Sequence, residues 1–101
     1  MIKFGEIIDE KKPILINFFA DWSEDCQGIH DQLKHVNASL RDRLVIIKID
    51  AEKNPQLVKA LKVKNLPTYM LYSLGKVIWR ESGKKEANEL IIDLKRQTSR
   101  N

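Results

Sequence analysis

The chain has 101 residues, so we expect a single domain over residues 1–101 with one modest hydrophobic core. Hydrophobic residues make up 43% of it and charged residues 32%, and no run approaches the roughly 18 apolar residues of a membrane-spanning helix, which excludes a helical membrane protein. The net charge of +4 comes from basic residues spread along the chain without interleaved aromatic residues, so we expect neither a nucleic acid nor a membrane as partner. The N-terminal MIKFGEIIDEKK has acidic residues where a signal peptide is apolar, which predicts a cytoplasmic protein.

Cys26 is the single cysteine of the chain. One cysteine excludes a disulfide within the chain and a metal cluster built from cysteines alone, and we expect neither a metal ion nor a cofactor. The thiol is therefore inert, reactive toward another molecule, or able to link two copies of the chain. We expect a monomer, with a dimer linked through Cys26 as the alternative.

The first half of the chain predicts a strand, a helix and a second strand. The apolar runs ILINFF at 14–19 and LVIIKID at 44–50 have strand length and indicate burial on both faces. Between them, a helix is expected to begin near Ser23. Its apolar stripe has spacings of four, three and four, and consists of Ile29, Leu33, Val36 and Leu40. A strand, helix and strand joined by short connections form a parallel pair, which places the start of this helix at the carboxyl ends of the strands, where open α/β sheets usually keep their chemistry.

The second half predicts a short helix and a hairpin. The helix extends from about 54 to 62, and the hairpin strands at 69–72 and 76–80 flank a turn that contains Gly75. Pro67 comes just before the first of these strands, where it removes no ladder hydrogen bond.

A last helix is expected after Gly83, with an apolar face that covers the sheet. The residues of that face recur at helical spacing and are Ala87, Leu90, Ile91 and Leu94. Strands that alternate with helices in this way indicate an α/β fold.

Four segments, ILINFFADWSEDC, IKIDAEKNP, VKNLPTYMLYSLGKV and SGKKEANEL, resemble thioredoxins in their order and spacing. The likeness covers nearly the whole chain. The positions that carry it are Trp22, Asp50, Leu66 to Thr68, Gly75 and Gly83. The resemblance implies a thioredoxin fold, with a central mixed sheet of four strands, or five with a short first strand, and helices on both faces. It also implies a first helix at about Phe4 to Asp9.

The resemblance places the active-site tetrapeptide, Cys-Gly-Pro-Cys in thioredoxins, at Ser23-Glu24-Asp25-Cys26. In the family the first cysteine attacks the substrate disulfide, and the second resolves the mixed disulfide that forms. Ser23 cannot form a disulfide, and a serine hydroxyl without an activating base is a negligible nucleophile. We therefore name Cys26 and Ser23 as the candidate catalytic positions, with Ser23 at the place of the missing nucleophile.

Other positions depart from the family as well. The buried aspartate of thioredoxins corresponds to Asn17, which cannot accept a proton, and the accompanying lysine corresponds to Ile46. Ser23 is either the natural residue or a replacement of a natural cysteine. The acidic pair Glu24 and Asp25, together with Asn17, favours the natural residue, because such changes serve no purpose in removing a thiol.

The tetrapeptide also has a purely structural interpretation. Serine is a favourable helix N-cap, and Glu24 and Asp25 would then lie in the first turn, where acidic residues stabilise a helix. On that helix Cys26 would join the apolar stripe as a small hydrophobic residue. His30 lies one helical turn beyond Cys26, which leaves a Cys–His contact open as a further alternative.

The resemblance further implies a groove that binds an extended peptide, with Trp22, Leu66, Pro67 and Gly83 as candidate substrate-binding residues and a cis peptide bond before Pro67. Two functions then remain. One is thiol-disulfide exchange with a protein partner through mixed disulfides of Cys26. The other is a binding module that recognises an extended segment without redox chemistry.

Overall fold

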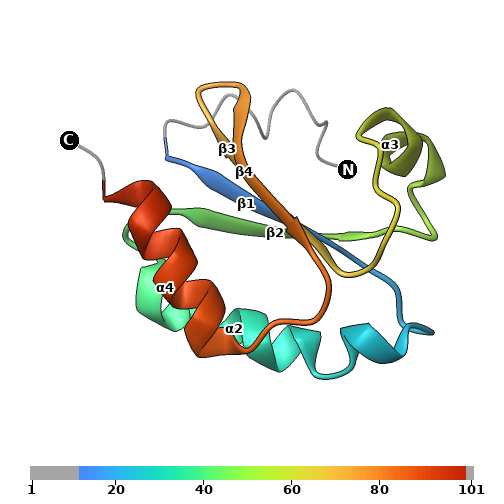
Figure 1. Cartoon of the computed structure of the whole chain (residues 1–101), viewed down its shortest axis with the longest axis horizontal. Helices are drawn as coiled ribbons and strands as arrows, with labels where there is room; N and C mark the ends of the chain where they lie inside the picture. Colours follow the sequence, from blue (N-terminus) through green and yellow to red (C-terminus); the bar gives the residue numbers. More distant parts are fainter. Residues whose placement is uncertain (1–11, 100–101) are drawn as a thin grey trace.

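The computed structural model describes residues 12–99, which form one sheet with helices on both of its faces (Figure 1). The helix expected at about 4 to 9 and the short first strand lie outside the described residues. The elements, in chain order, are β1 (Ile14–Phe19), the 3-10 helix η1 (Glu24–Cys26), α2 (Ile29–Leu40), β2 (Val45–Asp50), α3 (Pro55–Ala60), β3 (Thr68–Ser73), β4 (Lys76–Ser82) and α4 (Ala87–Thr98). None of the described helices is long and apolar enough to cross a membrane.

The described strands form one mixed sheet in the order β2-β1-β3-β4. β1 and β2 are parallel, as the strand, helix and strand pattern predicts, and their register pairs Ile14 with Val45 and Phe19 with Asp50. The pairs β1–β3 and β3–β4 are antiparallel. The expected α/β class and the mixed sheet are therefore confirmed.

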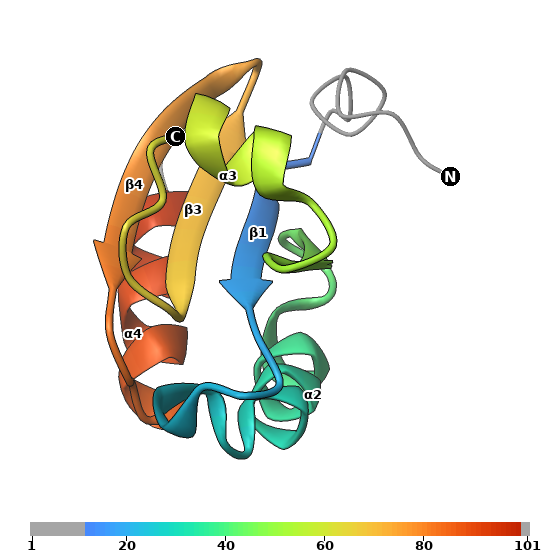
Figure 2. The same cartoon turned by 90° about the vertical axis from the view of Figure 1, so that its right-hand side faces the viewer.

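The core has two layers because alternate residues of a strand point to opposite faces of the sheet. Leu15 and Phe19 of β1 contact the layer that α2 and α4 cover, whereas Ile16 and Phe18 contact the layer on the side of α3. Figure 1 shows α2 and α4 side by side, and Figure 2 shows α3 on the opposite face of the sheet. The predicted apolar faces of α2 and α4 are buried in the first layer.

The helix expected from Ser23 begins instead at Ile29, so that expectation is wrong. Glu24–Cys26 form only a short 3-10 turn. Gly28 then has φ of +73°, a left-handed conformation that glycine adopts at little cost. This change in backbone direction separates the turn from α2, although the residues on both sides have helical propensity.

The hairpin between β3 and β4 has a two-residue turn. Leu74 and Gly75 both have positive φ, at 53° and 79°, which is the type I′ geometry that matches the twist of the flanking strands. Gly75 thus has the role that the sequence predicts. β4 runs to Ser82, two residues beyond the predicted end, and pairs there with Thr68.

The segment after α3 is held against β4. α3 ends at Ala60, and Lys62 has φ of 56°. The guanidinium of Arg80 donates hydrogen bonds to the carbonyl oxygens of Leu61 at 2.7 Å and Lys62 at 2.6 Å. These bonds satisfy carbonyl groups at the end of the helix and fix the start of the loop that leads to Pro67.

Candidate functional site

The loop after β1 presents Trp22 and Ser23 at the carboxyl end of the strand. The amide of Ser23 donates a hydrogen bond to the Ala20 carbonyl at 3.2 Å, which closes a tight turn. Trp22 is 68% exposed, a large fraction for an apolar side chain, whereas Ser23 is only 9% exposed. The side chain of Ser23 makes no capping hydrogen bond, so its expected role as a helix N-cap is wrong.

A concave site of about 480 Å³, which we call the Trp22 groove, lies beside this loop. Three chain segments form it: the loop after β1, the loop after β2, and α3 with the loop that follows it. Its apolar lining consists of Trp22, Ala51, Val58, Val63 and Leu66, and its polar lining of Ser23, Glu52, Lys64 and Asn65. The structure therefore brings Trp22, Ser23 and Leu66 together, three of the residues that the sequence singles out.

Pro67 and Gly83 lie next to each other, but they do not line this groove. The peptide bond between Leu66 and Pro67 is cis, the isomer that the resemblance implies. The amide of Gly83 donates a hydrogen bond to the Pro67 carbonyl at 2.8 Å, and Pro67 itself is buried. That carbonyl is thus already bonded within the chain.

Cys26 lies in the layer between the sheet and the helices α2 and α4. Its side chain is 6% exposed and belongs to the same buried cluster as Ile29 and Leu33. The thiol forms no disulfide with another of the described residues. This placement agrees with the interpretation of Cys26 as a small apolar residue, although η1 rather than α2 carries it.

Asn17 occupies the middle of β1 and is completely buried. In the register of the sheet it lies between Lys48 of β2 and Tyr69 of β3. Neither its Nδ2 nor its Oδ1 has a hydrogen-bond partner among the residues that the structure describes. A buried amide without partners is unfavourable, so Asn17 marks a polar position inside an otherwise apolar layer.

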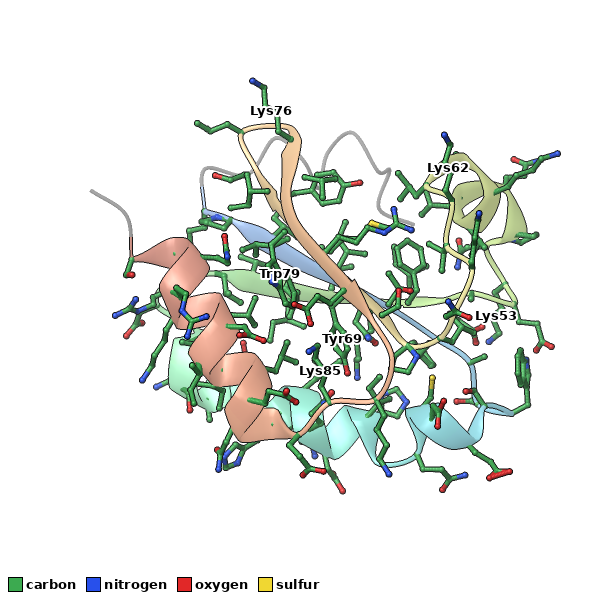
Figure 3. The ribbon with its side chains drawn as sticks, viewed as in Figure 1. Lys53, Lys62, Tyr69, Lys76, Trp79 and Lys85 are labelled. Atoms are coloured by element: carbon green, nitrogen blue, oxygen red, sulfur yellow. The ribbon has the colours of Figure 1, made fainter. Side chains whose placement is uncertain are left out.

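Tyr69 is a buried residue of this interior for which the sequence pattern predicts only a place in a strand. Its hydroxyl donates a hydrogen bond to Oε1 of Gln32 at 2.8 Å, and Nε2 of Gln32 donates to the carbonyl oxygen of Lys85. Figure 3 labels Tyr69 and Lys85, the two ends of this chain of bonds. The chain of bonds joins β3, α2 and the segment before α4. A tyrosine within an apolar strand was the one available signal, since a buried hydroxyl usually has a partner.

Burial raises the pKa of Tyr69 from the usual 10 to about 12. The hydrogen bond with Gln32 lowers this pKa, while the negative charge of an ionised Cys26 would raise it further. The phenol therefore stays neutral at physiological pH. A carboxylate could remove a proton from the thiol of Cys26. In the described part of the interior, none is supplied by the polar side chains of Asn17, Tyr69 and Gln32.

His30 contacts other side chains than that of Cys26. Its ring meets Phe19 edge to face, with centroids 4.9 Å apart, and its Nδ1 lies 3.2 Å from Nζ of Lys48. Cys26 lies in η1 and His30 in α2, so the helical spacing on which the alternative of a Cys–His pair rests does not occur.

The arrangement can thus hold an extended apolar segment, but it lacks the parts of a dithiol catalyst. The open groove offers an indole, aliphatic side chains and a few polar groups on its lining. Its lining includes the hydroxyl of Ser23, which has no hydrogen bond to a base, and the thiol of Cys26 is buried in the layer on the side of α2 and α4. Recognition by shape and apolar contact is the chemistry that these groups supply best.

Comparisons with known proteins give a consistent result. A family model described as Thioredoxin matches residues 2–96. A thioredoxin-like protein of Synechocystis sp. is 33% identical over 92 residues, which cover 90% of this chain and 88% of that protein. Thioredoxin Y2, chloroplastic, of Arabidopsis thaliana is 38% identical over 80 residues, which cover 79% of this chain and 48% of that protein.

The chain spans about half the length of its chloroplastic relatives; for thioredoxin Y2 the covered share is 48%. Among solved structures, chloroplastic thioredoxin z superposes with a TM-score of 0.83 at 21% identity, over 98% of this chain and 93% of that one. An identity this low establishes the shared fold alone.

Proposed function

The chain belongs to the thioredoxin family, and on that premise we propose that it binds an extended segment of a partner protein in the Trp22 groove without dithiol exchange. The observation that carries this proposal is the contrast in exposure between Trp22 and Cys26, four residues apart in the chain. Trp22 is 68% exposed and lines an open groove, whereas Cys26 is 6% exposed and lies in the buried layer on the side of α2 and α4. The groups exposed to a partner are thus those that can bind it by contact, whereas the thiol is buried.

The groove suits one apolar side chain of the partner, flanked by polar backbone. Large aromatic side chains in concave apolar surroundings often dominate binding energy, and Trp22 has this environment with Val58, Val63 and Leu66. Glu52 and Lys64 on the same lining can bond to polar groups at either end of the bound segment.

The lack of dithiol exchange follows from the thiol count. The family's reaction needs one thiol to attack and a second to resolve, and the chain has only Cys26. Ser23 stands at the position of the attacking thiol and is 9% exposed, with no side-chain hydrogen bond to a base. A serine in that setting does not replace the missing thiolate.

A mixed disulfide through Cys26 is the second candidate function, and the free thiol at the end of η1, four residues beyond Trp22 in the chain, favours it. In that step Sγ of Cys26 loses its proton to solvent and attacks one sulfur of a partner disulfide. A new S–S bond joins the two proteins, and the other partner sulfur leaves as a thiolate that takes up a proton. Because Cys26 is nearly buried, we expect this reaction to be slow.

A binding measurement tests the first candidate. The probe is the S-carboxymethylated B chain of insulin, which carries no thiol or disulfide, followed by fluorescence anisotropy. We expect Trp22→Ala to weaken its binding about tenfold. The matched control Ile92→Ala removes another exposed apolar side chain, from α4, and should leave the affinity unchanged within about twofold. Equal affinity for wild type and Trp22→Ala, or no binding up to about 1 mM, would contradict the proposal.

A disulfide reduction assay with intact insulin tests the second candidate. We expect the wild type to reduce no insulin catalytically, because Cys26 has no partner thiol. Mass spectrometry after incubation with oxidised glutathione should show at most slow addition to Cys26. Rapid and complete addition would establish the mixed disulfide as the main chemistry, and turnover regained in Ser23→Cys would show that only the attacking thiol is missing.

A further inference from the structure

β2 is the outermost strand on its side of the sheet in the described part of the chain. Alternate residues of a parallel strand direct their backbone groups to the same neighbour. The amide of Val45 donates to the carbonyl of Pro13, just before β1, at 3.0 Å, and the amide of Ala51 donates to the carbonyl of Phe19 in β1 at 2.8 Å. Ile46 and Lys48 therefore direct their N–H and C=O groups away from β1, toward the open side of the sheet.

A cleft of about 220 Å³ runs along this edge between β2 and α2. We call it the β2 edge cleft; it is lined by His30, Leu33, Lys34, Asn37, Ile46 and Lys48. Leu33 and Ile46 give it an apolar floor. The lining holds two lysines and one histidine but no carboxylate, and Nζ of Lys48 lies 3.2 Å from Nδ1 of His30. The cleft is thus electropositive as well as open.

We propose that the outer edge of β2 binds an extended segment of a partner protein that carries carboxylates at alternate positions. The backbone of this segment would pair with the N–H and C=O groups of Ile46 and Lys48, as an added strand of the sheet does. Because side chains of a strand alternate between faces, every second residue would point into the β2 edge cleft. Carboxylates there meet Lys34 and Lys48.

The other alternate residues of the bound segment lie on the opposite face, beside Val45 and Ile47. Both of these side chains are partly buried and pack against the layer on the side of α3. Apolar residues fit that face. The recognised segment therefore alternates acidic and apolar residues, and a shift of its register by one residue would exchange the two faces.

The charges of the edge favour an acidic partner over a second copy of this chain. Pairing β2 with β2 of another molecule would bring the lysines of two β2 edge clefts close together, and like charges on neighbouring strands are destabilising. Lysine on an edge strand is also a common protection against self-association. This surface shares no lining residue with the Trp22 groove, so it stands independently of the function proposed above.

Amide NMR spectra of the full chain test this inference. The probe is a short peptide that alternates valine and glutamate. We expect saturable shifts and slower hydrogen exchange at the amides of Ile46 and Lys48, and an affinity that falls as salt is raised toward 1 M. A peptide with lysine in place of glutamate should not bind, and neither should the glutamate peptide with alternate backbone nitrogens methylated.

Charge reversal gives the matched test. Lys34→Glu combined with Lys48→Glu should weaken binding of the glutamate peptide by roughly fivefold or more and allow the lysine peptide to bind. The control is Lys76→Glu, at the remote β3–β4 turn. It changes the net charge by the same amount for each lysine replaced and should have little effect on the affinity for the glutamate peptide. Should the double variant unfold, Lys48→Gln together with the salt dependence provides the same comparison.

Three results would overturn the inference. The first is a failure of the glutamate peptide to saturate its binding at concentrations up to about 1 mM. Its shifts could instead cluster at Trp22 and Leu66, which would assign it to the Trp22 groove. Shifts at Ile46 and Lys48 that appear on raising the protein concentration alone would identify a second copy as the occupant.

Discussion

The two sides of the loop after β1 differ in solvent exposure and in the kinds of side chain that they present. On one side the Trp22 groove is open, with an exposed indole, aliphatic walls and polar groups. On the other, Cys26 and Tyr69 lie in an apolar layer closed by α2 and α4. A surface suited to recognition is thus present in a molecule whose interior lacks the thiol pair and the carboxylate that the family resemblance implies.

The interior side also has polar groups, but they serve packing. Tyr69, Gln32 and the carbonyl of Lys85 form one hydrogen-bonded chain that connects three elements. Asn17 has no such partners among the described residues. If this comparison is correct, changes in the interior should alter stability, and changes at the groove should alter binding.

The largest effect is expected for Tyr69→Ala. Removal of a fully buried aromatic side chain leaves a cavity and typically lowers the free energy of unfolding by about 3–5 kcal/mol. The change also frees Oε1 of Gln32 from its hydrogen bond. Urea denaturation measures the effect. A loss below about 1 kcal/mol would show that this side of the molecule is not the packed interior described above.

Asn17→Leu should raise the free energy of unfolding by about 1–3 kcal/mol. The two side chains have similar shape, and the change removes two buried polar atoms that lack partners. The control Asn37→Leu, at an exposed position of α2, should change stability by no more than about 0.5 kcal/mol. A loss of stability in Asn17→Leu would instead indicate that a buried water satisfies the amide.

Tyr69→Phe should lower the free energy of unfolding by about 1 kcal/mol at neutral pH, because it removes one hydrogen bond. It should also alter the pH dependence. The pKa of Tyr69 is about 12 in the folded protein against 10 ordinarily, so between these values the unfolded chain binds fewer protons and stability falls as pH rises.

Urea denaturation at pH 8, 10 and 11 separates this effect from others. The fall in stability above pH 10 should be smaller in Tyr69→Phe than in the wild type. Some fall should remain, because burial also raises the pKa of Tyr72. An identical slope in both proteins would argue that the Tyr69 phenol ionises as freely in the folded state as in the unfolded one.

The smallest effect on stability is expected for Trp22→Ala, within about 0.5 kcal/mol of the wild type. Its side chain is 68% exposed and lies outside both buried clusters. Thermal unfolding measures this change. A loss of about 2 kcal/mol or more would assign Trp22 to the core and remove the contrast between the two sides.

Much of the fold follows from local patterns in the sequence. The apolar run at 14–19, Gly75 in the turn and the stripes of α2 and α4 each specify an element through its own residues. The sequence predicts too early a start for α2, because Ser23 and the acidic residues after it match the pattern of a helix N-terminus. The left-handed conformation of Gly28, which ends that match, cannot be read from a glycine alone.

The site was predictable to the extent that it rests on neighbouring residues. Trp22, Ser23 and Leu66 do line one groove. Gly83 was grouped with them, yet it bonds to Pro67 away from that lining. The partner of Tyr69 lies 37 residues away, in Gln32, and the isolation of Asn17 depends on everything packed around it. These contacts form only when the helices pack on the sheet, so local sequence patterns do not predict them.

Two forms of one peptide provide the most direct test of whether the groove or the thiol makes the contact. The B chain of insulin is prepared with its cysteines S-carboxymethylated, and separately with the same cysteines disulfide-linked to glutathione, and both are titrated into the wild-type protein. We expect affinities equal within about twofold and no peptide bound covalently to Cys26. Binding of the disulfide form alone, increasing with time and leaving the peptide on Cys26, would contradict this expectation.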